Sequence, residues 1–198
     1  MTLMGQVEAG QTDTGEAWLV RHGETEWSRD GRHTSTTDLP LTDAGRRVAA
    51  ELRGRLAGQE FSLVLTSPRD RARETARLAG YADAEVDDDL AEWCYGELEG
   101  LTSVEIQQTY PGWTIWDGPW PGGETPADVR ERFDRVVARC REVAGPVLLF
   151  SHGHALRVLA ERWLDQPVEE GRHLYLDTAT VSILGDDRGT PVVKRWNS

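Results

Sequence analysis

Two histidines, each followed by glycine, stand just after short apolar runs of the chain. Residues 17–20 lead directly into Arg21 and His22. Residues 146–150 form a second run, which ends two residues before His152. Such runs are typical of buried strands, and open α/β sheets bind ligands where their strands end. If the two strands pair, both imidazoles lie beside Arg21 and indicate a functional site, although either histidine alone could simply cap its strand.

An arginine and a glutamate further along the chain are the next candidates. Arg69, Arg73 and Arg77 recur every four residues and share one face of a predicted helix. Arg71 lies off that face, so it either points inward or is one more surface arginine. Glu92 lies between apolar and aromatic neighbours, which disfavour its charged form and suit a general acid.

Metal binding is the alternative role for the histidines. His152 and His154 form a His-x-His pair, and His33 is a third imidazole. Metallohydrolase clusters with this spacing place an acidic residue in one of the next two positions, but Ala155 and Leu156 stand there. The spacing therefore favours a site without a metal.

Composition narrows the classes of partner and ligand. The chain has 198 residues, with 22 Lys and Arg against 34 Asp and Glu, and a formal charge of −12. This acidity disfavours nucleic acid or an anionic membrane as partner. Lys194 is the single lysine, so a local cationic cluster would consist of arginines, whose planar donors suit phosphate or carboxylate.

Cysteine usage and hydropathy predict a cytoplasmic location. Cys94 and Cys140 are widely spaced, and the chain has neither a signal peptide nor an apolar run long enough to span a membrane. We interpret Cys94 as a small buried side chain rather than a nucleophile. Residues 1–16 lack an apolar period and predict a disordered tail.

Alternating strand and helix patterns predict a single α/β domain over residues 17–198, a three-layer sandwich with a mostly parallel sheet flanked by helices. The helix after Thr42 is expected to bury Val48, Leu52 and Leu56. Thr125 and Asp128 resemble a capping box that opens another helix. The expected strands are 17–20, 61–65, 84–86, 146–150, 173–185 and 191–196, and the expected helices are 42–56, 66–78, 125–140 and 153–164.

Residues 92–123 lack a clear period and contain four tryptophans among several glycines and prolines. We interpret this stretch as an insertion that folds over the site as a lid. Packing and a substrate-covering role are equally open for Trp113, Trp116 and Trp120.

Taken together, the motifs resemble the histidine phosphatase superfamily, in its phosphoglycerate-mutase-like branch, from about Trp18 to near the C-terminus. The Arg-His-Gly triplet alone is a weak signal, but five motifs in the family's order are highly specific. They are Arg21-His22-Gly23-Glu24-Thr25, Ser67-Pro68-x-x-Arg71-Ala72-x-x-Thr75-Ala76, Glu92-x-x-Tyr95-Gly96-x-x-Glu99-Gly100, Gly122-Gly123-Glu124-Thr125 and Ser151-His152-Gly153.

The resemblance implies roles for the five candidates. His22 would be the nucleophile that takes up the phosphoryl group, and Glu92 would be the proton donor. Arg21, Arg71 and His152 would surround the phosphate. These roles agree with elementary chemistry, because a neutral imidazole is nucleophilic near pH 7 and fixed cations can stabilise phosphoryl transfer without a metal or other cofactor.

Within this branch, departures from the mutase pattern favour a phosphatase. Ser28 replaces the asparagine of mutases, Ser35 replaces a glycine, and Ser103 stands near their lysine. No arginine lies between Glu92 and Arg130 to hold a substrate carboxylate. The closer resemblance is to sedoheptulose-bisphosphatase-type sugar phosphatases and to acid phosphatases, while a phosphoglycerate mutase or a non-catalytic phospholigand-binding relative remains an alternative.

The expected activity is metal-independent hydrolysis of small phosphomonoesters through phosphohistidine, with sugar phosphates or bisphosphates as substrates and a homodimer as an open possibility. Arg32 and His33 would meet a second anionic group, unless they are merely exposed loop residues. The candidate substrate-binding residues are Ser28, Arg32, His33, Thr34, Ser35, Tyr95 and His154.

Overall fold

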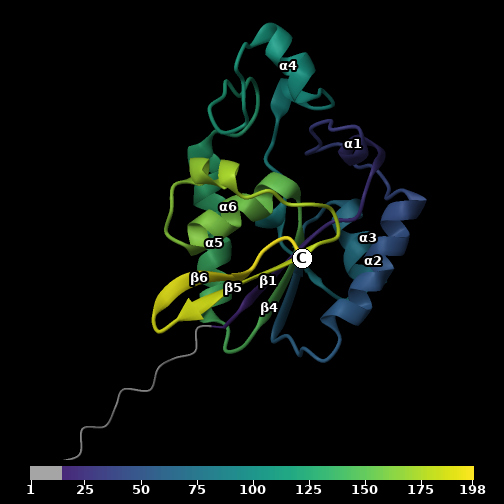
Figure 1. Ribbon diagram of the computed structural model, residues 1–198, viewed down its shortest axis with the longest axis vertical. Coiled ribbons are helices and arrows are strands. Elements are labelled where there is room, and N and C mark those ends of the chain that lie inside the picture. Colours follow the sequence, from purple (N-terminus) through teal and green to yellow (C-terminus); the bar gives the residue numbers. More distant parts are fainter. Residues whose placement is uncertain (1–14) are drawn as a thin grey trace, which may run out of the picture.

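The computed structural model describes residues 15–198 and contains one six-stranded sheet, in the order β3-β2-β4-β1-β5-β6 (Figure 1). Strands β1 to β4 pair in parallel, and β5 and β6 join antiparallel at one edge. The strands are β1 (Ala17–Arg21), β2 (Leu63–Thr66), β3 (Glu85–Val86), β4 (Val147–Ser151), β5 (Val181–Asp187) and β6 (Thr190–Arg195).

Helices cover both faces of the sheet, α2 and α3 on one side and α5 and α6 on the other (Figure 1). Successive side chains of β4 point to opposite faces of the sheet. Leu148 and Phe150 pack with Leu52 of α2, whereas Leu149 packs with Phe133 of α5. The predicted three-layer α/β sandwich is therefore confirmed. These helices are α2 (Asp43–Leu56), α3 (Asp70–Ala79), α5 (Pro126–Glu142) and α6 (Gly153–Trp163).

Local signals explain where these helices begin. The Thr42 hydroxyl accepts from the Gly45 N–H and caps α2. The capping box of Thr125 and Asp128 opens α5, as predicted. On α2, Val48 is exposed, contrary to expectation, and the buried positions are Gly45, Ala49, Leu52 and Leu56. The buried face of α2 includes the small residues Gly45 and Ala49, which a pattern of large apolar side chains does not reveal.

Other boundaries differ from expectation. Helix α3 begins at Asp70 rather than at residue 66, because residues 67–69 carry polar contacts near the strand end. The strand expected at 173–185 begins only at Val181. Before it, Val168–His173 forms a 3₁₀ helix, η3, and residues 174–180 are irregular.

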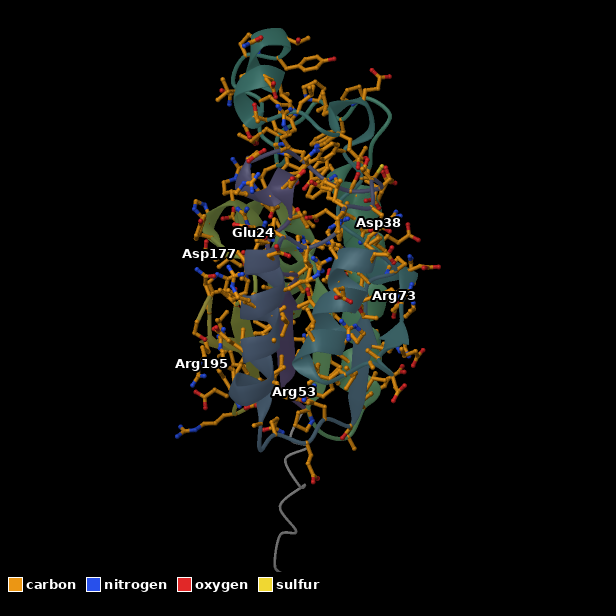
Figure 2. All side chains as sticks on the ribbon, turned by 90° about the vertical axis from the view of Figure 1, so that its right-hand side faces the viewer. Glu24, Asp38, Arg53, Arg73, Asp177 and Arg195 are labelled. Atoms are coloured by element: carbon orange, nitrogen blue, oxygen red, sulfur yellow. The ribbon has the colours of Figure 1, made fainter. Side chains whose placement is uncertain are left out.

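The insertion at 92–123 contains more structure than its pattern predicts. It includes the 3₁₀ helix η2 (Gly96–Leu98) and the helix α4 (Ser103–Thr109), which Thr102 and Glu105 open with a capping box. Figure 1 shows α4 beyond the end of the sheet, on the same side as the short helix α1 (Glu26–Arg29). In Figure 2 Glu24 and Asp38 lie nearer that end of the molecule than Arg53.

The predicted tail, residues 1–16, lies outside the described residues except for its last two positions. Glu16 belongs to the domain, because its carbonyl accepts from the Val147 N–H and its carboxylate pairs with Lys194. Within residues 15–198, no helix is long and apolar enough to cross a bilayer.

Candidate active site

Strands β1 and β4 bring the two histidines together, as predicted. The register sets Arg21 opposite Ser151, and the His22 N–H donates to the Ser151 carbonyl at 2.9 Å. The ring centroids of His22 and His152 are 5.1 Å apart. Residues far apart in the chain therefore meet at the carboxyl end of the sheet.

His22 is held in one tautomer. Its Nδ1 lies 2.7 Å from the Gly23 carbonyl, which can only accept, so Nδ1 carries the proton. Nε2 has no hydrogen-bond partner within residues 15–198 and opens into a cavity. Burial, with Arg71 and Arg21 nearby, lowers the pKa of His22 well below its usual value. The neutral ring thus presents a lone pair to the cavity.

Arg71 points inward, as one of its two interpretations predicted. Its side chain is fully buried. Backbone carbonyls hold both terminal nitrogens, Nη1 on Thr37 at 3.1 Å, and Nη2 on Thr34 at 3.1 Å and Ser35 at 3.2 Å. Nε donates to His152 Nδ1 at 3.2 Å. The guanidinium is therefore fixed by the loop 34–37 and by the second histidine.

His152 also has both ring nitrogens engaged. Nδ1 accepts from Arg71, so the neutral ring carries its proton on Nε2, which lies 2.7 Å from the Ser67 hydroxyl. Burial and the neighbouring Arg71 lower the pKa of His152 well below the usual value. Arg71 and His152 stand behind the cavity wall rather than among its lining residues. Neither therefore lines the cavity in this structure, and the His152 ring meets the His22 ring edge to face.

Arg21 contributes a cation that does line the cavity. Its Nη1 donates to the Leu176 carbonyl at 2.5 Å, whereas its buried Nε has no partner within the described residues. Gly153 permits this approach, because a Cβ there would lie 3.3 Å from the Arg21 guanidinium. An unpartnered buried N–H beside the His22 ring is suited to an anionic ligand.

Glu92 lines the same cavity, but the prediction that its carboxyl has apolar surroundings is wrong. Its Oε1 accepts from the N–H groups of Trp93 at 2.9 Å and Ala155 at 2.8 Å, and its Oε2 accepts from that of His154 at 3.2 Å. Two of these donors belong to the first turn of α6, where the helix dipole also favours negative charge. The carboxyl is therefore held by polar groups and lines the same cavity as His22.

The cavity has a volume of about 270 Å³, near the lower end for small-molecule sites. We call the lining residues Arg21, His22 and Glu92, together with Arg71 and His152 behind the cavity wall, the floor. The remaining lining side chains, which we call the rim, come from four segments. They are Ser28, Arg32, His33, Thr34, Tyr95, Ser103, His154, Arg157, Tyr175 and Leu176.

Six of the seven predicted substrate-binding residues lie on the rim, and Ser35 does not. Ser35 is buried, its hydroxyl donates to Glu99 at 2.8 Å, and its carbonyl accepts from Arg71. The Ser28 hydroxyl is already used in the cap of α1 with Thr25. Ser35 is therefore part of the support for Arg71 rather than a ligand for the substrate.

An aromatic cluster forms the far side of the rim. His33 stacks on His154 at 6.1 Å and meets Tyr95 and Trp113 edge to face. The His33 Nδ1 donates to the Leu101 carbonyl, so its Nε2 is an acceptor. Burial lowers the pKa of both His33 and His154, and His154 the more strongly.

Tyr95 sets the tautomer of His154. Burial, and the charge of Glu92, raise the pKa of Tyr95 well above its usual value, so it keeps its proton. Its hydroxyl lies 2.6 Å from His154 Nδ1 and donates to it. The neutral His154 ring then carries its proton on Nε2. The rim thus offers one imidazole acceptor and one imidazole donor.

The His-x-His pair is not arranged as a metal site. His152 is bonded to Ser67 and Arg71, and His154 to Tyr95. Within residues 15–198 no three His, Cys, Asp or Glu side chains are placed to hold an ion together.

Cys94 is half-buried rather than buried, and it does not line the cavity. The tryptophans of the insertion pack. Trp113 and Trp116 are buried, and Trp120 packs partly buried against the same core. The insertion lines the cavity with Tyr95 and Ser103 instead.

Two residues that matter for the geometry are absent from the predicted site. Arg157 lies on the rim, with its guanidinium 4.7 Å over the Trp116 ring and its Nε on the Gly171 carbonyl at 2.8 Å. Its helix face could have revealed it, because Arg157 follows Gly153 by one turn of α6. Glu99 stands in a family motif, but no sequence pattern shows what its carboxylate contacts.

Comparison with known proteins agrees with this geometry. Residues 17–198 match the family described as histidine phosphatase superfamily (branch 1). The chain belongs to this superfamily. An acid phosphatase of Mycobacterium tuberculosis is 44% identical over 86% of either chain. A sedoheptulose 1,7-bisphosphatase of Saccharomyces cerevisiae is 34% identical over 89% of this chain and 77% of its own.

Solved structures of this superfamily have the same fold. An open reading frame product of Mycobacterium tuberculosis superposes with a TM-score of 0.87 at 40% identity, over 92% of this chain and 97% of the other. A mycobacterial glucosyl-3-phosphoglycerate phosphatase in complex with VO3 gives 0.81 at 27% identity, over 93% and 99%. The prediction of a phosphatase of the histidine phosphatase superfamily is confirmed.

Proposed function

We propose that this enzyme is a metal-independent phosphomonoesterase of small phosphorylated metabolites, with sugar phosphates or sugar bisphosphates as substrates. The observation that carries the proposal is the His22 ring, which is neutral, protonated on Nδ1 and open to the cavity at Nε2. Arg21 and Glu92 line the cavity beside it. The names of the relatives support the substrate class.

The first step forms phosphohistidine. The Nε2 lone pair of His22 attacks phosphorus, and the bond between phosphorus and the ester oxygen breaks. Arg21 faces the charge that gathers on the phosphoryl oxygens, and Arg71 and His152 support the ring from behind. The leaving oxygen receives a proton from Glu92. A monoester with a second pKa near 6 binds partly as the monoanion and can bring that proton with it.

The second step releases phosphate. A water molecule attacks the phosphorus of phosphohistidine, and its proton passes to the Glu92 carboxylate as the nitrogen–phosphorus bond breaks. Inorganic phosphate leaves and His22 returns to the neutral state. Over the whole cycle one water is consumed and no metal or redox change is needed.

Phosphate release from a panel of sugar phosphates, sugar bisphosphates, phosphoglycerates and an aryl phosphate, each measured after exhaustive chelation, tests this proposal. We expect turnover in the presence of chelator. We also expect a phosphoryl group on His22 that survives when the reaction is quenched with base and is lost when it is quenched with acid. The Cys94→Ser variant is the control and should behave as wild type. Activity that returns only with an added divalent metal, or phosphoryl transfer to a phosphoglycerate instead of to water, would contradict it.

A further inference from the structure

Glu99 lies outside the cavity and binds the loop that holds Arg71. Its Oε1 accepts from the N–H groups of Ser35 at 3.0 Å and Thr37 at 2.6 Å. Its Oε2 accepts from the hydroxyls of Ser35 at 2.8 Å and Thr36 at 2.6 Å. One carboxylate therefore accepts four hydrogen bonds from three consecutive residues.

These contacts suit an ionised carboxylate. Burial alone would raise the pKa of Glu99, but the hydrogen bonds from Thr36, Thr37 and Ser35 outweigh it and lower the pKa to about 2. No Lys or Arg side chain within residues 15–198 forms an ion pair with Glu99. Its negative charge is thus directed at the loop and not at a cation.

Apart from Glu99 and Arg71, residues 35–37 have one further hydrogen-bond partner within residues 15–198, the Tyr95 N–H, which donates to the Ser35 hydroxyl at 3.3 Å. His33 is tied by main-chain bonds to Gly100 and Leu101, but residues 35–37 form bends outside any helix or strand. The N–H groups of Ser35 and Thr37 both donate to Glu99. Without that carboxylate, two main-chain donors and the Thr36 hydroxyl would lose their partner, and the Ser35 hydroxyl would keep only its contact with the Tyr95 N–H.

The opposite side of the same loop supports Arg71. The carbonyls of Thr34, Ser35 and Thr37 accept from its Nη1 and Nη2, and its Nε donates to His152. The peptide units of residues 35 and 37 thus lie between a carboxylate and a guanidinium. The chain of contacts runs from Glu99 through the loop to Arg71 and then to His152.

We propose that Glu99 is a positioning residue of the reaction, which holds the loop 35–37 so that its carbonyls set the Arg71 guanidinium against His152 and His22. This inference rests on the proposed phosphatase chemistry at His22. Glu99 does not line the cavity, so it acts through the loop. Three loop carbonyls hold Arg71, which makes Arg71 the main route, whereas the Ser35 hydroxyl has a single contact with the Tyr95 N–H. Loss of the carboxylate lets the carbonyls shift, and a displacement of about 1 Å in a catalytic group can cost up to about 100-fold in rate.

Three single variants provide the first test. Glu99→Ala removes all four contacts and should lower kcat by about 10- to 100-fold. Glu99→Gln should keep most of the activity, because its amide oxygen accepts from the two N–H groups while its NH₂ donates to the two hydroxyls, which can rotate to accept. Glu97→Ala, in the 3₁₀ helix η2 that ends just before Glu99, is the control. The Glu97 carboxylate is exposed and has no hydrogen bond or ion pair within residues 15–198. Glu97→Ala changes the net charge as Glu99→Ala does, and it should leave kcat unchanged.

A double-mutant cycle separates positioning from a general structural role. Arg71→Met keeps much of the side-chain volume but removes the groups that the loop carbonyls hold. In that background Glu99→Ala should cost less than about threefold, because the contact through which it acts is gone. If Glu99→Ala does not fold, Thr36→Val replaces it in the cycle, with a smaller loss that Arg71→Met should mask in the same way.

The outcomes are distinct from a failure of the proposed function. If wild type forms no phosphohistidine at His22, the phosphatase mechanism fails. If wild type forms phosphohistidine, two results would overturn the positioning role. One is a kcat of Glu99→Ala equal to that of Glu97→Ala. The other is an equal fold-loss in kcat from Glu99→Ala in the wild-type and the Arg71→Met backgrounds. An equal loss in Glu99→Gln and Glu99→Ala would overturn the hydrogen-bonded loop as its basis.

Discussion

The floor and the rim of the cavity differ in how their polar atoms are held. On the floor, the Gly23 carbonyl fixes the His22 ring, and the loop carbonyls fix Arg71, which in turn holds His152. On the rim, neither Nη atom of Arg157 has a hydrogen-bond partner within residues 15–198, and Tyr175 is 70% exposed. The floor groups are therefore preorganised, whereas on the rim the two Nη groups of Arg157 are left open to the rest of a substrate.

The largest effect should come from the floor. His22→Gln keeps polar character and much of the volume but removes the imidazole nucleophile, so kcat for an aryl phosphate should fall by about 10⁴-fold or more. The matched change on the rim, His33→Gln, should cost less than about tenfold. Steady-state kinetics with thermal melting of both variants provides the comparison. Similar losses at the two positions would abolish the distinction between floor and rim.

The role of Glu92 on the floor depends on the leaving group. Glu92→Gln retains an oxygen for the N–H groups of Trp93 and Ala155 but cannot transfer a proton. For a sugar phosphate, whose alkoxide is a poor leaving group, phosphorylation of His22 should slow by about 10²–10⁴-fold. For a nitrophenyl ester the loss should be much smaller, and a burst is expected if water attack becomes limiting.

Pre-steady-state phosphorylation with the two esters measures this difference directly. An equal loss for both leaving groups would mean that Glu92 positions groups rather than donating a proton. His154, whose Nε2 proton faces the cavity, would then be the next candidate acid.

The pH dependence of kcat/KM tests whether the His22 ring on the floor is neutral. Because burial, with Arg71 and Arg21, holds the pKa of His22 well below its usual value, the neutral nucleophile persists as the pH falls below 6.5. The acid limb of kcat/KM that belongs to His22 should therefore lie well below pH 6.5. An NMR titration of the ring should show the Nδ1–H tautomer and no protonation near pH 6.5. Titration of His22 at or above that value would contradict the neutral ring.

The same shift carries a stability consequence whose sign is fixed. The unfolded chain binds a proton at His22 near pH 6.5, whereas the folded chain does so only at lower pH. The contribution of His22 to the free energy of unfolding is therefore fully present above pH 6.5 and is lost progressively as the pH falls below it. His152 adds to the decline in the same direction.

The sequence was sufficient to predict the floor because strand ends are local features. The apolar runs before His22 and His152 predicted strands, and parallel pairing of β1 with β4 then brought the rings together. The departure of Arg71 from a solvated helix face left an inward and a surface position open, and the resemblance to the family's second motif indicated its role. Each of these signals lies within a few residues of the side chain that it places.

The support of the floor could not be predicted in the same way. Ser35 seemed a candidate for the substrate, but it lies beneath the cavity wall and joins Glu99 to Arg71. Glu92 seemed to lie in apolar surroundings because its chain neighbours are apolar, yet its donors include Ala155 of α6. Hydrogen-bond partners distant in the sequence decide both cases, and no local pattern encodes them.

The smallest predicted effect concerns the rim and the form of the substrate. Burial lowers the pKa of Arg157 to about 10, which still leaves the guanidinium charged at neutral pH. Trp116 and Gly171 orient it, while its two Nη groups remain open to an anion. Arg157→Gln should raise KM about tenfold for a substrate with a second phosphate or a carboxylate, as expected for one charged hydrogen bond.

The same variant should hardly change KM for an aryl monophosphate, which has no second anionic group, and should leave kcat for both substrates within about threefold. Arg130→Gln on α5 is the control, since Arg130 is exposed, lies away from the cavity and changes the charge equally. A similar rise in KM for both substrates would place Arg157 with the floor, as a ligand of the transferred phosphoryl group. A fall in kcat without a change in KM would have the same consequence, because it would mean that Arg157 acts in the transition state rather than on the distal part of the substrate.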